Sequence, residues 1–380
     1  MKKIKILYGL EAAGGGALKH LVYLATRLSE KYFDITVILS NKRGENIDCE
    51  ITKLINANIQ VIIMPIKRQI HLSDVKVLCK LVSVMGKGKY DIVHAHSSKA
   101  GGLFRIAALL TNISNIYYTP HCFYFQSKAG LTKKFFIFLE KILGFATTGI
   151  IVSESEQKAL IKHKIINPNK VLNINNAIDF DEYQHSTEIF EIKRKYGLTK
   201  ESIVVGAIGR LTYQKDWETF IYAAFEVIKK IPETEFLIVG EGELYGEIKK
   251  LIFKLNLENK IFLTGYVQNV YEIYGIIDIY INTSLWEGLP YVFLEAMRYK
   301  KPIVATDTGN GSILVDKETG FITPVKDYKS IANQIIFLIE NKALAKEMGQ
   351  RGNTLLIEKY SFEKFIQEHE RIYQKSTVGN

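Results

Sequence analysis

A strand-like run that ends in a glycine turn and leads into a helix limits the folds open to this chain. Residues 276–282 are an isoleucine-rich apolar run, the kind that forms a buried parallel strand. Glu287, Gly288 and Pro290 then break the run, and residues 292–297 have the pattern of a helix start. This order of strand, turn and helix places backbone N–H groups and the positive end of a helix dipole at the mouth of a crevice. The stretch therefore predicts an anion-binding site.

Two carboxylates flank this turn. Glu287 lies within it and Glu295 lies in the predicted helix, with seven residues between them. Carboxylates accept strong charge-assisted hydrogen bonds, so the pair is suited to hold sugar or ribose hydroxyls beside a bound phosphate. The spacing alone equally allows a glutamate near a helix N-terminus and a solvated helical glutamate.

Strand and helix patterns alternate in both halves of the chain. Because 380 residues are long for one core, this alternation predicts an α/β fold of two doubly wound, Rossmann-like domains that face an interdomain cleft. Helices at 328–346 and 362–374 are expected to close the chain. The predicted strands are 3–8, 34–40, 59–64, 91–96, 115–119, 149–153 and 170–179 in the first half, and 202–211, 235–243, 260–267, 276–282 and 302–307 in the second.

The composition, 47% hydrophobic and 24% charged, fits a soluble globular protein. No run approaches the roughly 18 apolar residues of a spanning helix, and the N-terminus leads into a strand rather than a signal peptide. The three cysteines have no zinc-like spacing and are expected to be structural thiols in a reducing compartment. We therefore expect a cytoplasmic protein.

The positive charge is confined to the first half of the chain. Residues 1–185 contain 25 Lys and Arg against 14 Asp and Glu, a net charge of +11, whereas residues 186–380 contain 25 against 26, a net of −1. A one-sided positive field indicates an anionic partner: membrane phospholipid, an acidic lipid-linked acceptor or nucleic acid. Nucleic acid ranks last, because no helix-turn-helix, RRM or zinc-finger pattern is present.

The first half offers a glycine turn and several histidines as candidate site residues. Residues 14–16 are three glycines between the first strand and a helix at 17–28; they permit close approach of backbone to a ligand, although a flexible turn without a ligand is the alternative. His94 and His96 lie two apart on a strand and face the same side. No third metal ligand is in register, so interior or cleft-edge histidines are favoured over a metal site. His121 follows the strand end at Thr119, where ligands bind in open α/β sheets.

Residues 131–143 form a strongly apolar segment with Lys133, Lys134 and Lys141 at its edges. If helical, it is suited either to lie in a membrane interface or to pack in the core with snorkelling lysines. The charge asymmetry favours contact with a membrane.

In the second half, Arg210 and Lys215 straddle a predicted strand-to-helix loop, and Gly209 permits a tight turn there. Two fixed cations at a helix mouth suit a diphosphate leaving group, because negative charge grows on it as a glycosidic bond breaks. Exposed loop cations without a ligand are the alternative.

Three motifs together resemble a known family. Glu287-Gly-Leu-Pro-Tyr-Val-Phe-Leu-Glu295, Gly209-Arg-Leu with Lys215-Asp216, and Thr119-Pro-His121 are similar to the motifs of retaining glycosyltransferases of family four, which have the GT-B fold. The aromatic run after His121 is similar to members that build capsule or exopolysaccharide on undecaprenyl diphosphate. The resemblance spans nearly the whole chain.

This resemblance implies transfer of a sugar from a nucleotide-diphosphate donor, with UDP favoured, to a glycan acceptor on a lipid carrier. It implies that Arg210 and Lys215 stabilise the departing diphosphate, while Glu287 and His121 contact the donor sugar. Glu295 would hold the ribose, and no metal or other cofactor is implied, since no DxD-type acidic pair is evident. The further donor-binding positions are Gly15, Gly16, Gly209, Tyr266, Val267, Gly288, Leu289 and Pro290.

In the GT-B arrangement, residues 1–183 would form the acceptor-side domain and residues 184–361 the nucleotide-sugar domain, with a helix at 362–380 that crosses back to the first. We expect a peripheral protein on the cytoplasmic face of the inner membrane, attached through its basic N-terminal domain, with no nucleic-acid partner. The alternatives are a GT-B nucleotide-sugar epimerase or hydrolase and a non-catalytic nucleotide-sugar binding module.

Overall fold

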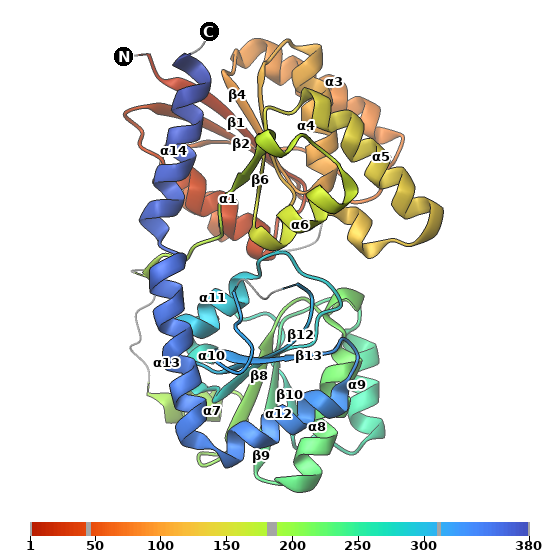
Figure 1. Cartoon of the computed structure of the whole chain (residues 1–380), viewed down its shortest axis with the longest axis vertical. Coiled ribbons are helices and arrows are strands. Elements are labelled where there is room, and N and C mark those ends of the chain that lie inside the picture. The colour runs from red at the N-terminus through yellow and green to blue at the C-terminus, as the bar shows by residue number, and fades with distance from the viewer. Residues whose placement is uncertain (1, 43–46, 181–187, 310–312, 379–380) are drawn as a thin grey trace. The chain divides into compact units, whose positions relative to one another are not determined.

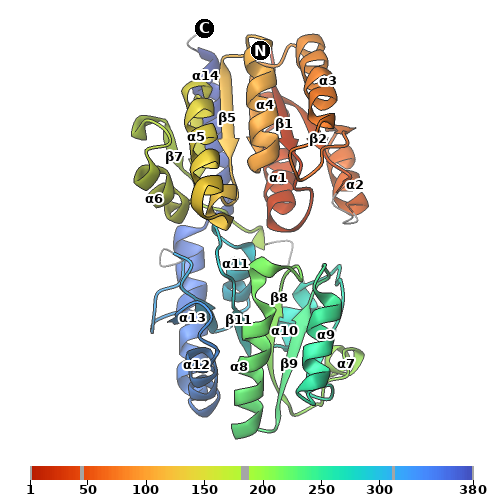
Figure 2. The ribbon, with the colours of Figure 1, turned by 90° about the vertical axis from the view of Figure 1, so that its right-hand side faces the viewer.

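The computed structural model describes residues 2–42, 47–180, 188–309 and 313–378 and divides into two compact units (Figure 1). Unit 1 consists of residues 1–176 and 363–380, and unit 2 consists of residues 177–362. The expected domain boundary at residues 183 and 184 lies outside the described residues. Each unit has one parallel sheet with helices on both faces, as the alternating pattern predicted (Figures 1 and 2).

Unit 1 is built on a seven-stranded parallel sheet with the strand order β3-β2-β1-β4-β5-β6-β7. Its strands are β1 (Ile4–Leu10), β2 (Phe33–Leu39), β3 (Gln60–Ile63), β4 (Ile92–His96), β5 (Asn115–Thr119), β6 (Gly149–Val152) and β7 (Val171–Asn173). Its α-helices are α1 (Gly15–Arg27), α2 (Asp48–Asn56), α3 (Ser73–Gly88), α4 (Ser98–Leu110), α5 (Gly130–Ala146), α6 (Glu154–His163) and α14 (Phe362–Val378), and the 3-10 turns are η1 (Tyr124–Ser127) and η2 (Pro168–Lys170).

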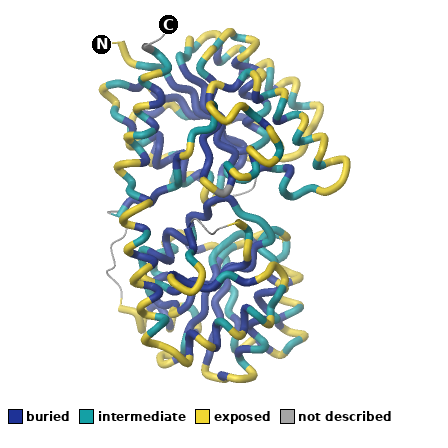
Figure 3. The backbone as a smooth tube through the Cα atoms, in the orientation of Figure 1, coloured by how far each residue is buried: buried dark blue, intermediate teal, exposed yellow. Residues whose placement is uncertain are grey.

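The central strands of unit 1 are buried on both faces (Figure 3). On one face α3 and α4 pack on the sheet, and the fit is close: a Cβ atom added at Gly9 of β1 would lie 2.1 Å from the Phe104 ring of α4. On the other face α14 brings Tyr373 against Tyr8, with an Oη–Oη distance of 3.2 Å. The last helix of the chain is therefore part of the core of unit 1.

Unit 2 is built on a six-stranded parallel sheet with the order β10-β9-β8-β11-β12-β13. Its strands are β8 (Ile203–Ile208), β9 (Thr234–Val239), β10 (Ile261–Leu263), β11 (Ile279–Asn282), β12 (Ile303–Thr306) and β13 (Gly320–Thr323). Its helices are α7 (Ile189–Lys195), the 3-10 turn η4 (Tyr213–Lys215), α8 (Trp217–Lys230), α9 (Tyr245–Lys254), α10 (Tyr271–Ile276), α11 (Tyr291–Arg298), α12 (Tyr328–Glu340) and α13 (Lys342–Lys359).

The C-terminal part of unit 2 differs from the sequence prediction. The single helix expected at 328–346 is wrong: α12 ends at Glu340, and α13 continues to Lys359 after a break at Asn341. Asn341 has φ −117° and ψ 60°, outside the helical region, and its side-chain amide donates back to the Phe337 carbonyl at 2.8 Å. This local bond satisfies one of the last helical carbonyls and ends α12.

Both sheets reverse their strand order at one point. In unit 1 this switch point lies between β1 and β4, and in unit 2 it lies between β8 and β11. Ligands of open α/β sheets bind beyond the carboxyl ends of the strands at such points, because the connections there leave in opposite directions. The fold thus assigns one candidate site to each unit.

Candidate active site

At the switch point of unit 2, β8 leads through Gly209 and Arg210 into η4. Asp216 follows in the left-handed region, with φ 48°, and its Oδ2 accepts a hydrogen bond from Thr219 Oγ1 at 2.7 Å. This turn starts α8 directly after Lys215. Lys215 therefore lies in the loop between the end of β8 and the start of α8, the strand-to-helix loop that the sequence predicted.

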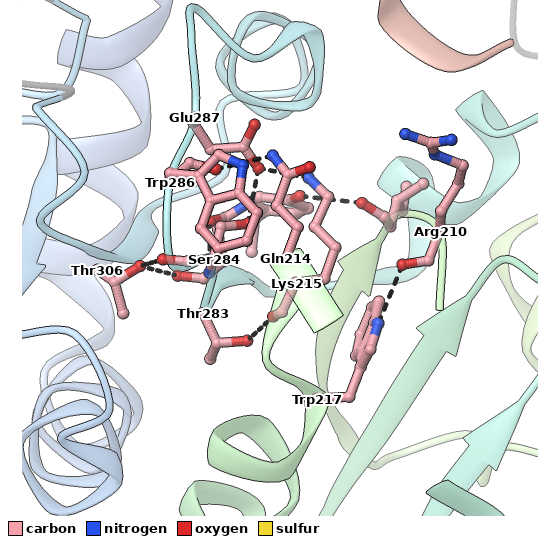
Figure 4. Close-up of polar contacts among 12 residues, drawn as sticks. Arg210, Gln214, Lys215, Trp217, Thr283, Ser284, Trp286, Glu287 and Thr306 are labelled. Carbon is pink, nitrogen blue, oxygen red and sulfur yellow. Dashed lines mark hydrogen bonds and ion pairs between the residues drawn. The ribbon is translucent and has the colours of Figure 1, made fainter. Parts of the chain in front are cut away.

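Lys215 forms an ion pair with Glu287, the acidic residue of the turn after β11. The distance from Lys215 Nζ to Glu287 Oε1 is 2.5 Å, and the two side chains are 18% and 9% exposed (Figure 4). Ser284 Oγ donates to the same carboxylate oxygen at 2.6 Å, and Thr283 Oγ1 donates to the Lys215 carbonyl at 2.7 Å. These charge-assisted bonds fix an ammonium and a carboxylate side by side at the switch point.

Backbone-directed bonds hold the turn after β11 in place (Figure 4). Gln214 Nε2 donates to the Trp286 carbonyl at 2.8 Å, and the Leu285 N–H donates to the Gln214 carbonyl at 2.8 Å. Thr306 Oγ1, at the end of β12, donates to the Ser284 carbonyl at 2.5 Å. The turn is thus tied to η4 on one side and to β12 on the other, which limits the positions that Glu287 can take.

Arg210 and Gly209 complete the strand end. The Arg210 carbonyl accepts a hydrogen bond from Trp217 Nε1 at 3.1 Å, and in Figure 4 the side chains of Arg210 and Lys215 both extend toward the upper edge of the view. A Cβ atom at Gly209 would lie 3.1 Å from Lys215 Cε. Glycine at this position therefore leaves room for the lysine side chain to cross the turn.

Glu295 lies inside α11, one helix turn beyond its start. Its side chain is 5% exposed, and Tyr274 Oη of α10 donates to Glu295 Oε2 at 2.8 Å. The alternative that the spacing allowed included a solvated helical glutamate at this position, and that part of it is wrong. Gly288, Leu289 and Pro290 are buried in the turn before α11. The carboxylate is held by a buried tyrosine rather than by bulk water.

Tyr266 and Val267 follow β10. The Tyr266 side chain is 60% exposed, while Val267 is 9% exposed. The Tyr266 N–H donates to Glu241 Oε1, in the loop after β9, at 3.3 Å. The structure places these residues at the carboxyl end of the sheet, at the edge away from the Lys215–Glu287 pair.

At the switch point of unit 1, the glycine turn leads from β1 into α1. Gly15 has φ 54°, and a Cβ atom there would find no heavy atom within 4 Å, so the turn borders open space. Gly16 is in the first turn of α1. Glu11, just after β1, is buried and accepts hydrogen bonds from Ser97 Oγ and, at 3.2 Å, from the Ala100 N–H. This carboxylate satisfies the N-terminus of α4.

His121 lies beyond the carboxyl end of β5 in the left-handed region, with φ 55°. Its Nε2 is 3.1 Å from Nδ1 of His96, the last residue of β4, and the two rings stack with centroids 5.3 Å apart. The His20 ring of α1 lies 4.7 Å from the His121 ring, centroid to centroid. Burial, together with the nearby His20, holds the pKa of His121 well below its usual range, so the ring is neutral at pH 7.

His94 belongs to the same cluster but has other partners. Its Nδ1 is 2.6 Å from Tyr373 Oη of α14, and its Nε2 is 2.9 Å from Thr119 Oγ1. The ring lies against that of His96, with centroids 4.2 Å apart and the planes tilted by 31°. The interior histidine that the sequence favoured is confirmed at this position.

Comparisons with known proteins identify the family. Residues 14–182 match the family described as Glycosyltransferase Family 4, and residues 188–354 match Glycosyl transferases group 1. A UDP-Gal:alpha-D-GlcNAc-diphosphoundecaprenol alpha-1,3-galactosyltransferase of Escherichia coli is 32% identical over 326 residues, 83% of each chain. The chain belongs to glycosyltransferase family 4. This glycosyltransferase is also 27% identical to the capsular polysaccharide biosynthesis glycosyltransferase CapM of Staphylococcus aureus over 355 residues, 91% of each chain.

Solved structures support the same assignment at the level of the fold. The crystal structure of Anabaena HepE in complex with UDP and glucose aligns with a TM-score of 0.84, at 21% sequence identity, over 98% of this chain and all of that chain. The sequence resemblance to family 4 and the prediction of a GT-B fold are therefore confirmed for this glycosyltransferase.

The structure brings some of the predicted residues of this glycosyltransferase together and adds others. Lys215 and Glu287, 72 positions apart, are in direct contact. Ser284 and Gln214 support them and were not predicted, because a serine and a glutamine in turns carry no distinctive pattern. In unit 1 His20 and His96 join His121. This cluster was not predicted, since the three histidines belong to three separate elements.

Proposed function

We propose that this glycosyltransferase moves a hexosyl or N-acetylhexosaminyl group from a UDP-sugar to a glycan on undecaprenyl diphosphate, with retention at the anomeric carbon and without a metal ion. The Lys215–Glu287 pair at the switch point of unit 2 is the observation that carries this proposal. The name of the Escherichia coli relative, a UDP-Gal-dependent enzyme acting on an undecaprenol-linked sugar, supports the donor and acceptor classes. Cell-surface polysaccharide is the expected product.

In the proposed reaction the Lys215 ammonium and the Arg210 guanidinium stabilise the diphosphate as negative charge grows on it. Lys215 exchanges Glu287 for the diphosphate when the donor binds, and the Glu287 carboxylate then accepts hydrogen bonds from hydroxyls of the sugar. Ser284 keeps that carboxylate in place during the exchange, because its Oγ donates to Oε1 independently of Lys215.

Nucleotide recognition and sugar contact involve the remaining residues. The Glu295 carboxylate, oriented by Tyr274, accepts hydrogen bonds from the ribose hydroxyls. Backbone N–H groups near Gly15 and Leu289 contribute to diphosphate binding, and the neutral imidazole of His121 contacts the transferred sugar. The leaving phosphate itself takes up the proton of the acceptor hydroxyl, so the chain needs no separate catalytic base.

A transfer assay tests this proposal. The protein is incubated with UDP-, GDP- and ADP-sugars and a polyprenyl-diphosphate-GlcNAc analogue, and the product is analysed by mass spectrometry and by the anomeric coupling constant in NMR. We expect one UDP-sugar to give an α-linked product at a rate that EDTA does not lower. Rapid UDP release with an epimerised sugar in the absence of acceptor would instead support the epimerase, and donor binding without turnover would support a binding module.

We further propose that α5 attaches the protein to the cytoplasmic face of the inner membrane. None of the described helices is both long and apolar enough to cross a bilayer, but α5 has an apolar stripe at its surface. The stripe residues recur every three or four positions on one face, and each is exposed by 48–86%: Leu131, Phe135, Phe138, Ile142 and Phe145. The opposite face packs through Phe136 and Ile137 on the core of unit 1.

One face of α5 thus packs in unit 1 and the other is exposed, and we infer that the exposed face makes the membrane contact. By the helical repeat, Lys134 and Lys141 lie beside the exposed stripe, where they are suited to contact anionic headgroups, whereas Lys133 lies on the side of the packed residues Phe136 and Ile137. A helix with an exposed apolar stripe and flanking lysines fits an interfacial position, and an undecaprenyl-linked acceptor would be presented at such a surface.

Vesicle co-sedimentation tests the attachment. We expect the protein to bind vesicles that contain about one-third anionic lipid, and the double substitution F135S/F138S to abolish binding while leaving the circular dichroism spectrum unchanged. Phe253→Ser, at a phenylalanine of α9 in unit 2 that is 70% exposed, is the control and should bind like the wild type. Equal binding of F135S/F138S and wild type would exclude α5 as the attachment site.

A further inference from the structure

The histidine cluster of unit 1 has the composition of a transition-metal site. His20 comes from α1, His96 ends β4 and His121 follows β5. Each offers one ring nitrogen, and these atoms all lie within 4.8 Å of one another. His20 and His96 are at most 1% exposed, and His121 is half-buried, so the cluster is enclosed on most sides and accessible on one.

The candidate ligand nitrogen of His20 has no hydrogen-bond partner. Among the described residues, His20 Nε2 is buried and unpartnered, whereas in His96 the nitrogen that faces His121 is the hydrogen-bonded Nδ1. His20 Nδ1 is 2.9 Å from Asn176 Oδ1, an atom that only accepts, so Nδ1 carries the proton and Nε2 carries a lone pair. A metal-binding histidine commonly donates its other N–H to a carbonyl oxygen in this way, which fixes the tautomer. A buried lone pair without a partner is costly, and a bound cation would satisfy it.

His94 does not take part, because both its nitrogens are engaged by Tyr373 and Thr119.

We propose that His20, His96 and His121 bind one divalent transition-metal ion of the zinc class, with the fourth coordination position facing the open side of the cluster. Zn–N distances of about 2.0–2.1 Å in a tetrahedral site correspond to nitrogens about 3.3 Å apart. His96 Nδ1 and His121 Nε2, at 3.1 Å, already have this spacing. His20 has to approach by at most about 1.5 Å, which a side-chain rotation on α1 provides.

A metal at this site would also affect sugar transfer; this effect rests on the proposed function, whereas the metal site itself does not. A metal on His121 Nε2 leaves only Nδ1 of that imidazole for the transferred sugar and fixes the orientation of the ring. Zinc therefore acts as an inhibitor of transfer, and the metal has no part in the reaction itself.

Metal binding is measured first and does not depend on activity. EDTA-treated, dialysed full-length protein is titrated with Co²⁺, followed by visible absorption, and with Zn²⁺ by calorimetry. We expect one equivalent per chain, a loss of zinc affinity of at least ~100-fold in His20→Gln, and a loss of about 10–100-fold in Asn176→Leu. His71→Gln, at an exposed histidine of the same unit, is the matched control and should bind like the wild type. Equal stoichiometry and affinity in His20→Gln and wild type would overturn the proposal.

Zinc-edge X-ray absorption of the wild-type complex keeps the proposal testable if a variant fails to fold. Scattering from three imidazoles is expected, and a sulfur ligand or oxygen ligands alone would overturn the site. Inhibition is then measured as the ratio of zinc-loaded to zinc-free transfer rates in wild type and His20→Gln. A protein that binds zinc but shows no transfer under any condition would contradict the proposed function and leave the metal site intact.

Discussion

The Lys215–Glu287 pair allows a structural ion pair to be distinguished from a catalytic one. We consider the isosteric substitutions Lys215→Met and Glu287→Gln, alone and combined. Breaking a fully buried pair on one side costs about 3–5 kcal/mol, and breaking an exposed pair costs about 0–1 kcal/mol. With side chains 18% and 9% exposed, each single substitution should lower the free energy of unfolding of unit 2 by about 1–3 kcal/mol. The double substitution should lower the free energy of unfolding by less than the sum of the two single effects, because it removes both charges and leaves neither one unpaired.

Activity should follow a different pattern. If the ammonium stabilises the departing diphosphate, Lys215→Met loses about 2–4 kcal/mol of transition-state stabilisation, a drop in kcat/KM of about 30- to 900-fold. Removing the Glu287 charge as well restores stability but supplies no cation, so the double variant should stay inactive.

Fluorescence isolates the stability measurement. The only two tryptophans of the chain are Trp217 and Trp286, and both belong to unit 2, so their emission during urea unfolding reports on that unit. Lys229 and Glu226 form an exposed pair on α8 and serve as a control cycle, in which neither stability nor transfer should change appreciably. A double variant that regains transfer, or a Lys215→Met variant within about threefold of wild type, would refute the role of Lys215.

Two further predictions concern unit 1. Burial lowers the folded-state pKa of His20 to about 3 and that of His369 to about 4, so below pH 6.5 the unfolded chain binds more protons than the folded chain. As the pH falls below 6.5, each histidine should therefore lower the free energy of unfolding by up to about 1.4 kcal/mol per pH unit. Circular dichroism melts at pH 7 and pH 5 should show this loss, and an unchanged melting temperature would contradict it. Arg105→Met should destabilise unit 1 by about 3–5 kcal/mol, because the buried Glu140 carboxylate loses the guanidinium that lies 2.8 Å away. Adding Glu140→Gln should recover most of this loss, as measured by urea titration. An Arg105→Met variant as stable as the wild type would argue against a stabilising role of this ion pair.

Most strands of both sheets and the residues at the unit 2 switch point could be predicted, because each rests on a local pattern, but the short edge strand β13 (Gly320–Thr323) was missed. The apolar run before Glu287 and the cations around Gly209 are visible in short windows of sequence, and parallel topology then places both at the same sheet edge. A short window of sequence does not show which elements contact one another in the fold. The convergence of His20, His96 and His121 depends on how α1 packs over β4 and β5, and no local periodicity encodes that packing.

The packing of α14 bears on how the chain is made. Unit 1 takes its final helix, α14 (Phe362–Val378), from a part of the chain that leaves the ribosome after nearly all of unit 2. Until then the hydroxyl of Tyr8 and the Nδ1 nitrogen of His94 lack the phenol of Tyr373 with which both interact in the finished protein. The N-terminal half therefore remains incomplete through most of translation, and a nascent chain that stops at residue 362 should stay prone to proteolysis and chaperone capture.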